Sequence, residues 1–345
     1  MSETSAVEIH EFDLTLADGR TLHGYECEGD GVAVMWHHGT PNVGTPPKPL
    51  FALAAELGLR WVSFDRPGYG GSTAHPGRTV ASVATDAAAL ADALDLERFA
   101  VVGHSGGGPH ALACAARQPA RVIAAVSLGG LAPFDAEGLD WFAGMGPTSH
   151  ASLRAAAAGI EGKRAHEQEH ADAPIDFTAD DWTALSGPWG WLGEVAAAGM
   201  ASGLDALIDD DLAYVTPWGV DLGAIIAPVL LAHGADDHVV PPSHSAWLAA
   251  HISTAERWRV EGESHISSLA AEHHGADDAL RWLAARVRPL LRKHGLERPP
   301  RIDPGTGTPL PRVLGRLGQR AEGGDRMLAN ELPAAAAAGL QPTLF

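Results

Sequence analysis

A serine that could act as a nucleophile lies in residues 103–107, which read Gly-His-Ser-Gly-Gly. An apolar run at 99–102 precedes it and a helix-forming segment at 111–117 follows it, so the serine would occupy a tight strand-to-helix turn. Glycines two residues before and two residues after Ser105 leave room where the strand and helix backbones approach each other. The start of the helix would point N–H groups toward whatever the serine attacks. This context favours nucleophilic catalysis over an idle serine in a glycine-rich turn.

A serine hydroxyl is a weak nucleophile unless a base takes its proton and a third group orients that base. Two aspartates, Asp236 and Asp237, directly follow one buried apolar strand, and His265 follows the next. Groups that face a ligand in a parallel sheet lie just beyond the carboxyl ends of its strands. An acid from this pair and His265 are therefore predicted to share a layer with Ser105.

The elements that must hold these side chains alternate between strand and helix. Predicted strands cover residues 7–16, 21–27, 32–36, 60–64, 99–102, 122–128, 228–232 and 257–260. Predicted helices cover residues 49–57, 79–94, 111–117, 243–251 and 276–291. Strands and helices that alternate at short spacing predict an α/β protein with a mostly parallel twisted sheet and helices on both faces.

Residues 135–220 interrupt this alternation. They contain no convincing buried strand, and their alanine-rich helical pieces carry five tryptophans. We interpret them as a helical cap inserted over the sheet, with residues 1–134 and 221–294 forming the core. Residues 295–345 are rich in proline and contain a run of five alanines, which predicts a disordered or weakly helical tail.

The composition excludes several classes of protein. A formal net charge of −19 argues against nucleic acid and against anionic membrane surfaces as partners. The N-terminus lacks the basic and apolar regions of a signal peptide, and no apolar run reaches the roughly 20 residues of a membrane span. The two cysteines, Cys27 and Cys114, are expected to be reduced thiols. We therefore expect a cytoplasmic protein that acts on a small molecule.

The sequence also lacks the motifs of bound cofactors and metals. It has no His-x-x-x-His with a helical glutamate and no cysteine pair at zinc spacing. The glycines at 103–108 lack the Gly-Lys-Ser/Thr of a P-loop and do not match the dinucleotide pattern. No metal and no cofactor is predicted.

Four motifs together resemble the α/β-hydrolases of the esterase/lipase and aminopeptidase-like kind, over roughly residues 7–292. They are His-His-Gly-Thr-Pro at 37–41, Asp-Arg-Pro-Gly-Tyr-Gly-Gly-Ser at 65–72, Gly-His-Ser-Gly-Gly-Gly-Pro at 103–109, and a Gly-Ala-Asp-Asp loop followed by Gly-Glu-Ser-His at 262–265. The resemblance implies a Ser-Asp-His chain order, with Ser105 as nucleophile, His265 as base and Asp237 as the acid that orients the histidine. It further implies an oxyanion hole made by the backbone N–H groups of Thr40 and Gly106.

The sequence alone leaves alternatives to Asp237 and His265. Asp236 is the alternative to Asp237, which is chosen on family spacing, and the aspartate that is not the acid would cap or turn the loop. Asp135 follows the strand after which some family members place the acid. His273 and His274 are alternatives to His265 as the base, but they lie in a segment that is predicted to be helix or surface.

The substrate pocket is less well defined. His38, His104, Trp141 and Trp189 are predicted to border it, although His38 would also orient its own loop and the tryptophans would also pack in a core.

The reaction expected from the resemblance is hydrolysis of a small ester through an acyl-serine. An amide or peptide hydrolase of the aminopeptidase kind, a cofactor-free perhydrolase, and a non-catalytic ligand-binding protein are the alternatives. Acids of the insertion that could hold a substrate amino group favour the peptidase: Glu161, Glu167, Glu169, Asp172, Asp176, Asp180, Asp181 and Glu194. The natural substrate and the oligomeric state do not follow from the sequence.

Overall fold

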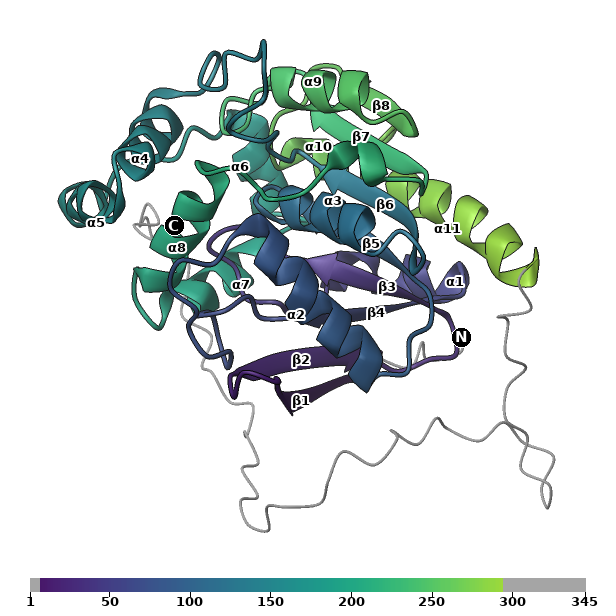
Figure 1. The fold of residues 1–345 in the computed structure, drawn as a ribbon. Coiled ribbons are helices and arrows are strands. Elements are labelled where there is room, and N and C mark those ends of the chain that lie inside the picture. Colours follow the sequence, from purple (N-terminus) through teal and green to yellow (C-terminus); the bar gives the residue numbers. More distant parts are fainter. Residues whose placement is uncertain (1–6, 294–345) are drawn as a thin grey trace, which may run out of the picture.

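An eight-stranded sheet forms the centre of the protein in the computed structural model, which describes residues 7–293 (Figure 1). The strand order is β1-β2-β4-β3-β5-β6-β7-β8, and β1, β2 and β4 pair antiparallel while the pairs from β4 to β8 are parallel. The strands are β1 (Ile9–Thr15), β2 (Thr21–Cys27), β3 (Val32–His37), β4 (Leu59–Phe64), β5 (Phe99–His104), β6 (Val122–Leu128), β7 (Val229–Gly234) and β8 (Ala255–Val260). The predicted mostly parallel sheet is confirmed.

Burial explains why these segments form strands. Every residue of β4, β5, β6 and β7 is buried, which matches their continuous apolar runs because both faces of a central parallel strand are covered. The edge strand β1 instead alternates between exposed and less exposed residues from Glu11 to Thr15, as a half-covered strand does.

Helices cover both faces of the sheet. The helices outside the predicted insertion are α1 (Phe51–Glu56), α2 (Val80–Ala93), α3 (Gly107–Arg117), α9 (Ser243–His251), α10 (Ser267–Ala270) and α11 (Ala276–Lys293), with short 3₁₀ turns at Lys48–Leu50 and Leu222–Ala224. One apolar cluster joins α2, α3 and α9 to Met35 and Phe64 of the sheet. The other joins α1 and α11 to Trp36 and Trp61, whose side chains point to the opposite face.

Helices also fill the segment between β6 and β7, where the sequence predicts an insertion. They are α4 (Pro147–Ala157), α5 (Ile160–Glu169), α6 (Ala179–Leu185), α7 (Trp191–Met200) and α8 (Asp205–Tyr214). In Figure 1, α4 and α5 lie at one end of the molecule, whereas α7 lies close to the strands. Trp141 and Trp218 pack in the first apolar cluster, and Trp189 and Trp191 pack in the second. The segment therefore shares its apolar core with the sheet.

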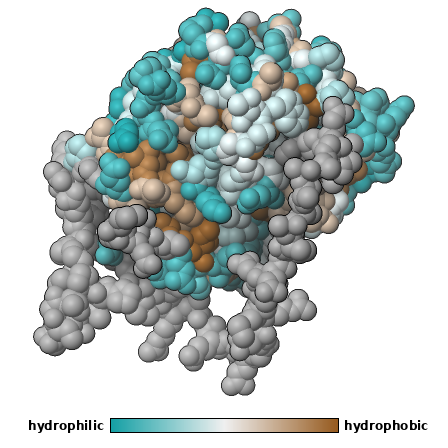
Figure 2. Space-filling model, turned by 180° about the vertical axis from the view of Figure 1, so that it is seen from behind, coloured by the Kyte–Doolittle hydropathy of each residue, from teal (hydrophilic) through white to brown (hydrophobic). Residues whose placement is uncertain are grey.

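The predicted tail at 295–345 lies outside the described residues, as do residues 1–6. Within residues 7–293, no helix has both the length and the apolar character needed to cross a bilayer. Figure 2 shows a rear face on which hydrophilic residues predominate and apolar residues gather in smaller areas. In the same range, the exposed large hydrophobic side chains are Ile160 and Ile226.

Candidate active site

Ser105 occupies a strained turn between β5 and α3. Its φ angle is +52°, in the left-handed region that residues other than glycine rarely adopt. A Cβ atom on Gly103 would lie 2.1 Å from the carbonyl oxygen of Gly107, and one on Gly107 would lie 1.9 Å from the carbonyl oxygen of His37. Only glycines allow the strand and helix to approach this closely, so the turn can present the serine at the end of the sheet.

Three predicted side chains meet beyond the carboxyl ends of β5, β7 and β8. Oγ of Ser105 lies 2.9 Å from Nε2 of His265, and Nδ1 of His265 lies 2.7 Å from Oδ2 of Asp237. Because the carboxylate can only accept, Nδ1 carries the ring proton and Nε2 is left to accept from the serine hydroxyl. This arrangement can move a proton from the serine to the ring.

Asp237 is 2% exposed, whereas its neighbour Asp236 is exposed. Its Oδ1 accepts hydrogen bonds of 2.9 Å from the backbone N–H groups of both Val239 and Val240, which fix the carboxylate. Burial works against its charge, but the favourable interactions with His265 and with His233 hold the pKa of this carboxyl below its usual range. Asp237 therefore stays ionised.

His265 is also buried. Burial favours the neutral ring, but the negative charge of Asp237 and the hydrogen bond to it outweigh burial, so the pKa of His265 lies above its usual 6.5. Asp181 of α6 adds to this upward shift. Its Oδ1 accepts from the N–H groups of Ile266 and Ser267, at 2.7 Å and 2.8 Å, and so also holds the backbone that follows the histidine.

The N–H groups of Thr40 and Gly106 have no hydrogen-bond partner within the part of the chain that the structure describes. Both residues line the same cavity as Ser105. Two free donors beside a nucleophile can stabilise an oxyanion.

The cavity over Ser105 has a volume of about 170 Å³. It is bordered by Thr40 and Gly106, by leucines and valines, and by a few polar side chains. Its lining comprises Thr40, Ser105, Gly106, Leu131, Ser149, Ser152, Leu153, Leu207, Asp211, Tyr214, Val239 and Val240. Helices α4 and α8 thus form much of its wall.

The histidines predicted to border the pocket are not among these lining residues. His38 is buried, donates from Nδ1 to the carbonyl of Gly39 and accepts at Nε2 from the N–H of Arg66. His104 packs against His265, with ring centroids 5.2 Å apart. Burial, followed by the neighbouring charge of His265, lowers the pKa of His104 to about 3, so its ring stays neutral.

The two predicted tryptophans also lie in the packed interior. The indole N–H of Trp141 donates to the carbonyl of Ala132, and its ring packs against His244. Trp189 is 3% exposed and belongs to the apolar cluster on the other face of the sheet. Both side chains bury apolar area there because a large aromatic ring stabilises a core more than it stabilises a solvated wall.

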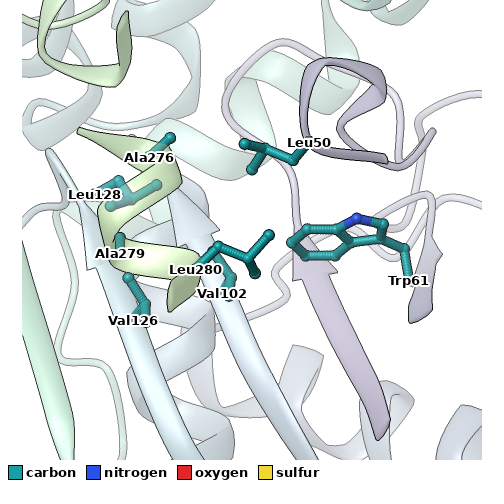
Figure 3. Close-up of a pocket in the computed structure, with 8 residues that line it drawn as sticks. All are labelled: Leu50, Trp61, Val102, Val126, Leu128, Ala276, Ala279 and Leu280. Carbon is teal, nitrogen blue, oxygen red and sulfur yellow. The ribbon is translucent and has the colours of Figure 1, made fainter. Parts of the chain in front are cut away.

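A second apolar space lies between α11 and the sheet, as Figure 3 shows. Its volume is about 10 Å³, which barely holds one water molecule, so it is a packing void and not a ligand site. Its walls are Leu50, Trp61, Val102, Val126, Leu128, Ala276, Ala279 and Leu280.

Three of the candidate acids of the insertion bind elsewhere. Asp176 accepts from the N–H of Ser149, Asp181 holds the backbone after His265, and Glu167 pairs with Lys163. None of the eight acids named as candidates for binding an amino group is among the cavity's lining residues.

Asp65 and Arg66 begin the motif at 65–72 and have different partners. Asp65 stays within the motif and accepts from the N–H of Gly71, at 2.9 Å. Arg66 instead reaches back to the carbonyl of Gly39 and forward to Asp210 of α8. No spacing rule links a loop residue to a partner 144 positions away, so this contact had no signal in the sequence.

The strained serine turn and the mostly parallel sheet with helices on both faces define a hydrolase of the α/β type. A family model described as alpha/beta hydrolase fold matches residues 32–271. The chain belongs to this family, as its motifs led us to expect.

Known relatives carry several activities in their names. A non-heme chloroperoxidase from Streptomyces lividans is 32% identical over 251 residues, covering 69% of this chain and 87% of the relative. A non-heme haloperoxidase from Rhodococcus erythropolis is 28% identical over 274 residues, covering 76% of this chain and 96% of the relative. The crystal structure of an enol-lactonase from Burkholderia xenovorans superposes with a TM-score of 0.59 at 19% identity, covering 80% of this chain and 99% of that one. Together these findings support a hydrolase.

Proposed function

We propose that the protein hydrolyses a small carboxylic ester through an acyl-serine intermediate, with Ser105 as nucleophile, His265 as base and Asp237 as the orienting acid. The observation that carries the proposal is the hydrogen-bonded chain from Asp237 to Ser105, at 2.7 Å and 2.9 Å, beside a cavity with two free N–H groups. A nucleophile, a base, an orienting acid and oxyanion donors are the parts that acyl transfer requires.

Acylation would begin when Oγ of Ser105 attacks the ester carbonyl and its proton passes to Nε2 of His265. The carbonyl oxygen gains a negative charge, which the N–H groups of Thr40 and Gly106 would receive. The intermediate collapses, the bond to the alcohol oxygen breaks, and His265 returns the proton to the leaving alcohol. Asp237 stabilises the imidazolium that exists between these two transfers.

Deacylation would repeat the sequence with water. His265 takes a proton from the water as its oxygen attacks the acyl carbonyl, and the same two N–H groups receive the charge. Collapse releases the carboxylic acid and returns the proton to Ser105. No redox change and no external group is needed.

The cavity limits the size of the group that it holds. A cavity of about 150 Å³ in another protein accommodates benzene, so about 170 Å³ here fits a group of roughly six heavy atoms. We therefore expect short-chain or compact esters to be the better substrates.

Labelling with a fluorophosphonate tests the proposal directly, because this probe reacts with an activated serine. Wild-type protein should label, and both Ser105→Ala and His265→Ala should not. A folded wild-type protein that fails to label would refute the proposal and favour a non-catalytic binding role.

A panel of p-nitrophenyl esters of increasing acyl length, run beside aminoacyl anilides, distinguishes esterase from aminopeptidase activity. Hydrolysis of short esters and not of anilides is the expected result. The reverse preference would establish the amide alternative.

A second candidate acceptor is hydrogen peroxide. One of the relatives described above is named a chloroperoxidase and the other a haloperoxidase. Peroxide could replace water in attacking the acyl-serine to give a peroxy acid. Peroxy acid formed from acetate or an acetyl ester with peroxide, and lost in Ser105→Ala, would support this activity.

A further inference from the structure

Helix α8 of the insertion contacts the oxyanion loop directly. The hydroxyl of Tyr214 lies 3.0 Å from the carbonyl oxygen of Gly106 and 2.8 Å from Oγ1 of Thr40. Thr40 also donates from Oγ1 to Oδ2 of Asp210, at 2.7 Å. The fit is close, because a Cβ atom on Gly106 would lie 2.3 Å from the tyrosine oxygen.

The peptide between Gly39 and Thr40 is held by its carbonyl. That oxygen accepts from Nδ1 of His38 at 2.8 Å, from Nη2 of Arg66 at 3.0 Å, and from the N–H of Asn42 at 3.1 Å. In a planar trans peptide the C=O and N–H bonds point in opposite directions. Donors on the Gly39 oxygen therefore fix the N–H of Thr40 on the other side, where the residue borders the cavity over Ser105.

Arg66 is held in turn by Asp210. Its Nε lies 3.1 Å from Oδ1 and its Nη2 lies 2.6 Å from Oδ2 of that carboxylate. Its Nη1 donates to the carbonyl of His38. Both charged side chains are almost fully buried, at 1% and 0% exposure, so water does not compete for these bonds.

We propose that α8 positions the oxyanion hole: Asp210 anchors Arg66, which locks the Gly39–Thr40 peptide with its N–H toward Ser105, and the Tyr214 hydroxyl donates to the carbonyl oxygen of Gly106 while the Thr40 hydroxyl donates to Asp210. This inference rests on the proposed function and adds positioning residues to it. The positively charged guanidinium of Arg66, which donates to the Gly39 oxygen, also polarises the peptide and strengthens its N–H as a donor. Donors that are oriented before the reaction need no reorganisation when the negative charge develops.

Arg66→Met removes the cation and leaves a side chain of similar length. Loss of one oxyanion donor typically lowers kcat about 10²–10³-fold, and partial misorientation should lower it about 10–100-fold. KM for p-nitrophenyl acetate should stay within about threefold, because the ground-state carbonyl needs the hole less. Affinity for a short alkylboronic acid, whose serine adduct carries the tetrahedral charge, should fall in parallel with kcat.

Arg60→Met is the matched control. Arg60 is also buried, but it pairs with Glu26 of β2 and not with Asp210 or the oxyanion loop. This variant should lose thermal stability as Arg66→Met does, yet keep kcat and boronate affinity within about threefold. Equal losses of kcat in both variants, or none in Arg66→Met, would overturn the proposal.

Two further variants keep the test decisive. Arg66→Lys should restore part of kcat over the methionine variant, because a shorter cation still reaches part of the same acceptor set. Tyr214→Phe retains the ring and removes only the hydroxyl, so it should fold and should lower both kcat and boronate affinity about 3–10-fold. Unchanged values in Tyr214→Phe would refute the role of α8 even if Arg66→Met failed to fold.

Failure of this inference is distinguishable from failure of the proposed function. Full activity in Ser105→Ala would refute the acyl-serine mechanism itself. Normal kinetics in the Arg66 and Tyr214 variants, with an inactive Ser105→Ala, would refute only the positioning role of α8.

Discussion

Nε2 of His265 lies 2.9 Å from Oγ of Ser105, although 160 residues separate the two. The contact exists because β5 and β8 are parallel strands of one sheet, so the loops that follow them open at the same edge. The whole of the segment between β6 and β7, with its five helices, lies between these two residues in the chain.

Activity should decline at low pH with the ionisation of His265. The pKa of His265 lies above 6.5, and only the neutral ring can accept the serine proton. kcat/KM should therefore fall as the pH drops through an apparent pKa above 6.5, and should be maximal above it. A pH–rate profile measures this, and an acid limb centred below pH 6 would contradict the assignment.

Asp237→Asn should lower kcat about 10³–10⁴-fold, since the amide no longer stabilises the imidazolium or fixes its tautomer. Asp236→Asn is the natural control, because this neighbour is exposed, and kcat should change less than about twofold. Comparable losses in the two variants would mean that the acid is wrongly assigned.

Asp181→Asn should shift the acid limb of the pH–rate profile to lower pH by less than about one unit. The carboxylate helps to raise the pKa of His265, and the amide would not. The Asp181 carboxylate also accepts from the backbone N–H groups of Ile266 and Ser267, so the substitution should lower the free energy of unfolding by about 1.5–3 kcal/mol. Asp180→Asn, at the exposed neighbouring position, should change neither the profile nor the stability.

Leu153→Ala should widen the range of accepted acyl groups, because this α4 side chain lines the cavity. The ratio of kcat/KM for a hexanoyl ester to that for an acetyl ester should rise about tenfold. Leu192→Ala removes an equally buried leucine of the insertion away from the cavity. Both variants should lose about 2–5 kcal/mol of stability, but only the first should change the acyl preference.

Stability should fall below about pH 6.5 through buried neutral histidines. Burial lowers the pKa of His37 and His104 to about 3 and that of His244 to about 4. As the pH falls, these histidines are protonated in the unfolded chain before they are protonated in the folded protein. Their contribution to the free energy of unfolding is therefore complete above pH 6.5. It is lost as the pH falls toward the folded pKa values, by up to about 1.4 kcal/mol per pH unit for each ring. His265, whose pKa is raised, acts in the opposite sense.

Urea unfolding at pH 8 and pH 5 measures this dependence. His104→Gln should reduce the difference between the two pH values, and His10→Gln, at an exposed position, should not. An equal pH dependence in wild type and His104→Gln would contradict the prediction.

The sequence predicts the alternation of strands and helices and the tight turn at the serine. It also predicts the chain order of the three site residues, Ser105, Asp237 and His265. Each depends on local information: apolar runs of strand length, glycines at a close approach, and the rule that parallel strands share an edge. The motifs of the family narrowed the choice between adjacent aspartates, and the structure brings Asp237 and not Asp236 to the histidine.

The tertiary structure alone decided what surrounds these residues. Trp141 and Trp189, expected on the pocket wall, lie in the core, and the wall is built from α4 and α8 instead. Arg66 meets Asp210 across 144 residues, and Tyr214 meets Gly106 across 108. Such contacts depend on how the helices between β6 and β7 fold back over the sheet. That docking depends on side-chain packing and buried charge over many residues at once, and these leave no periodic pattern in the sequence.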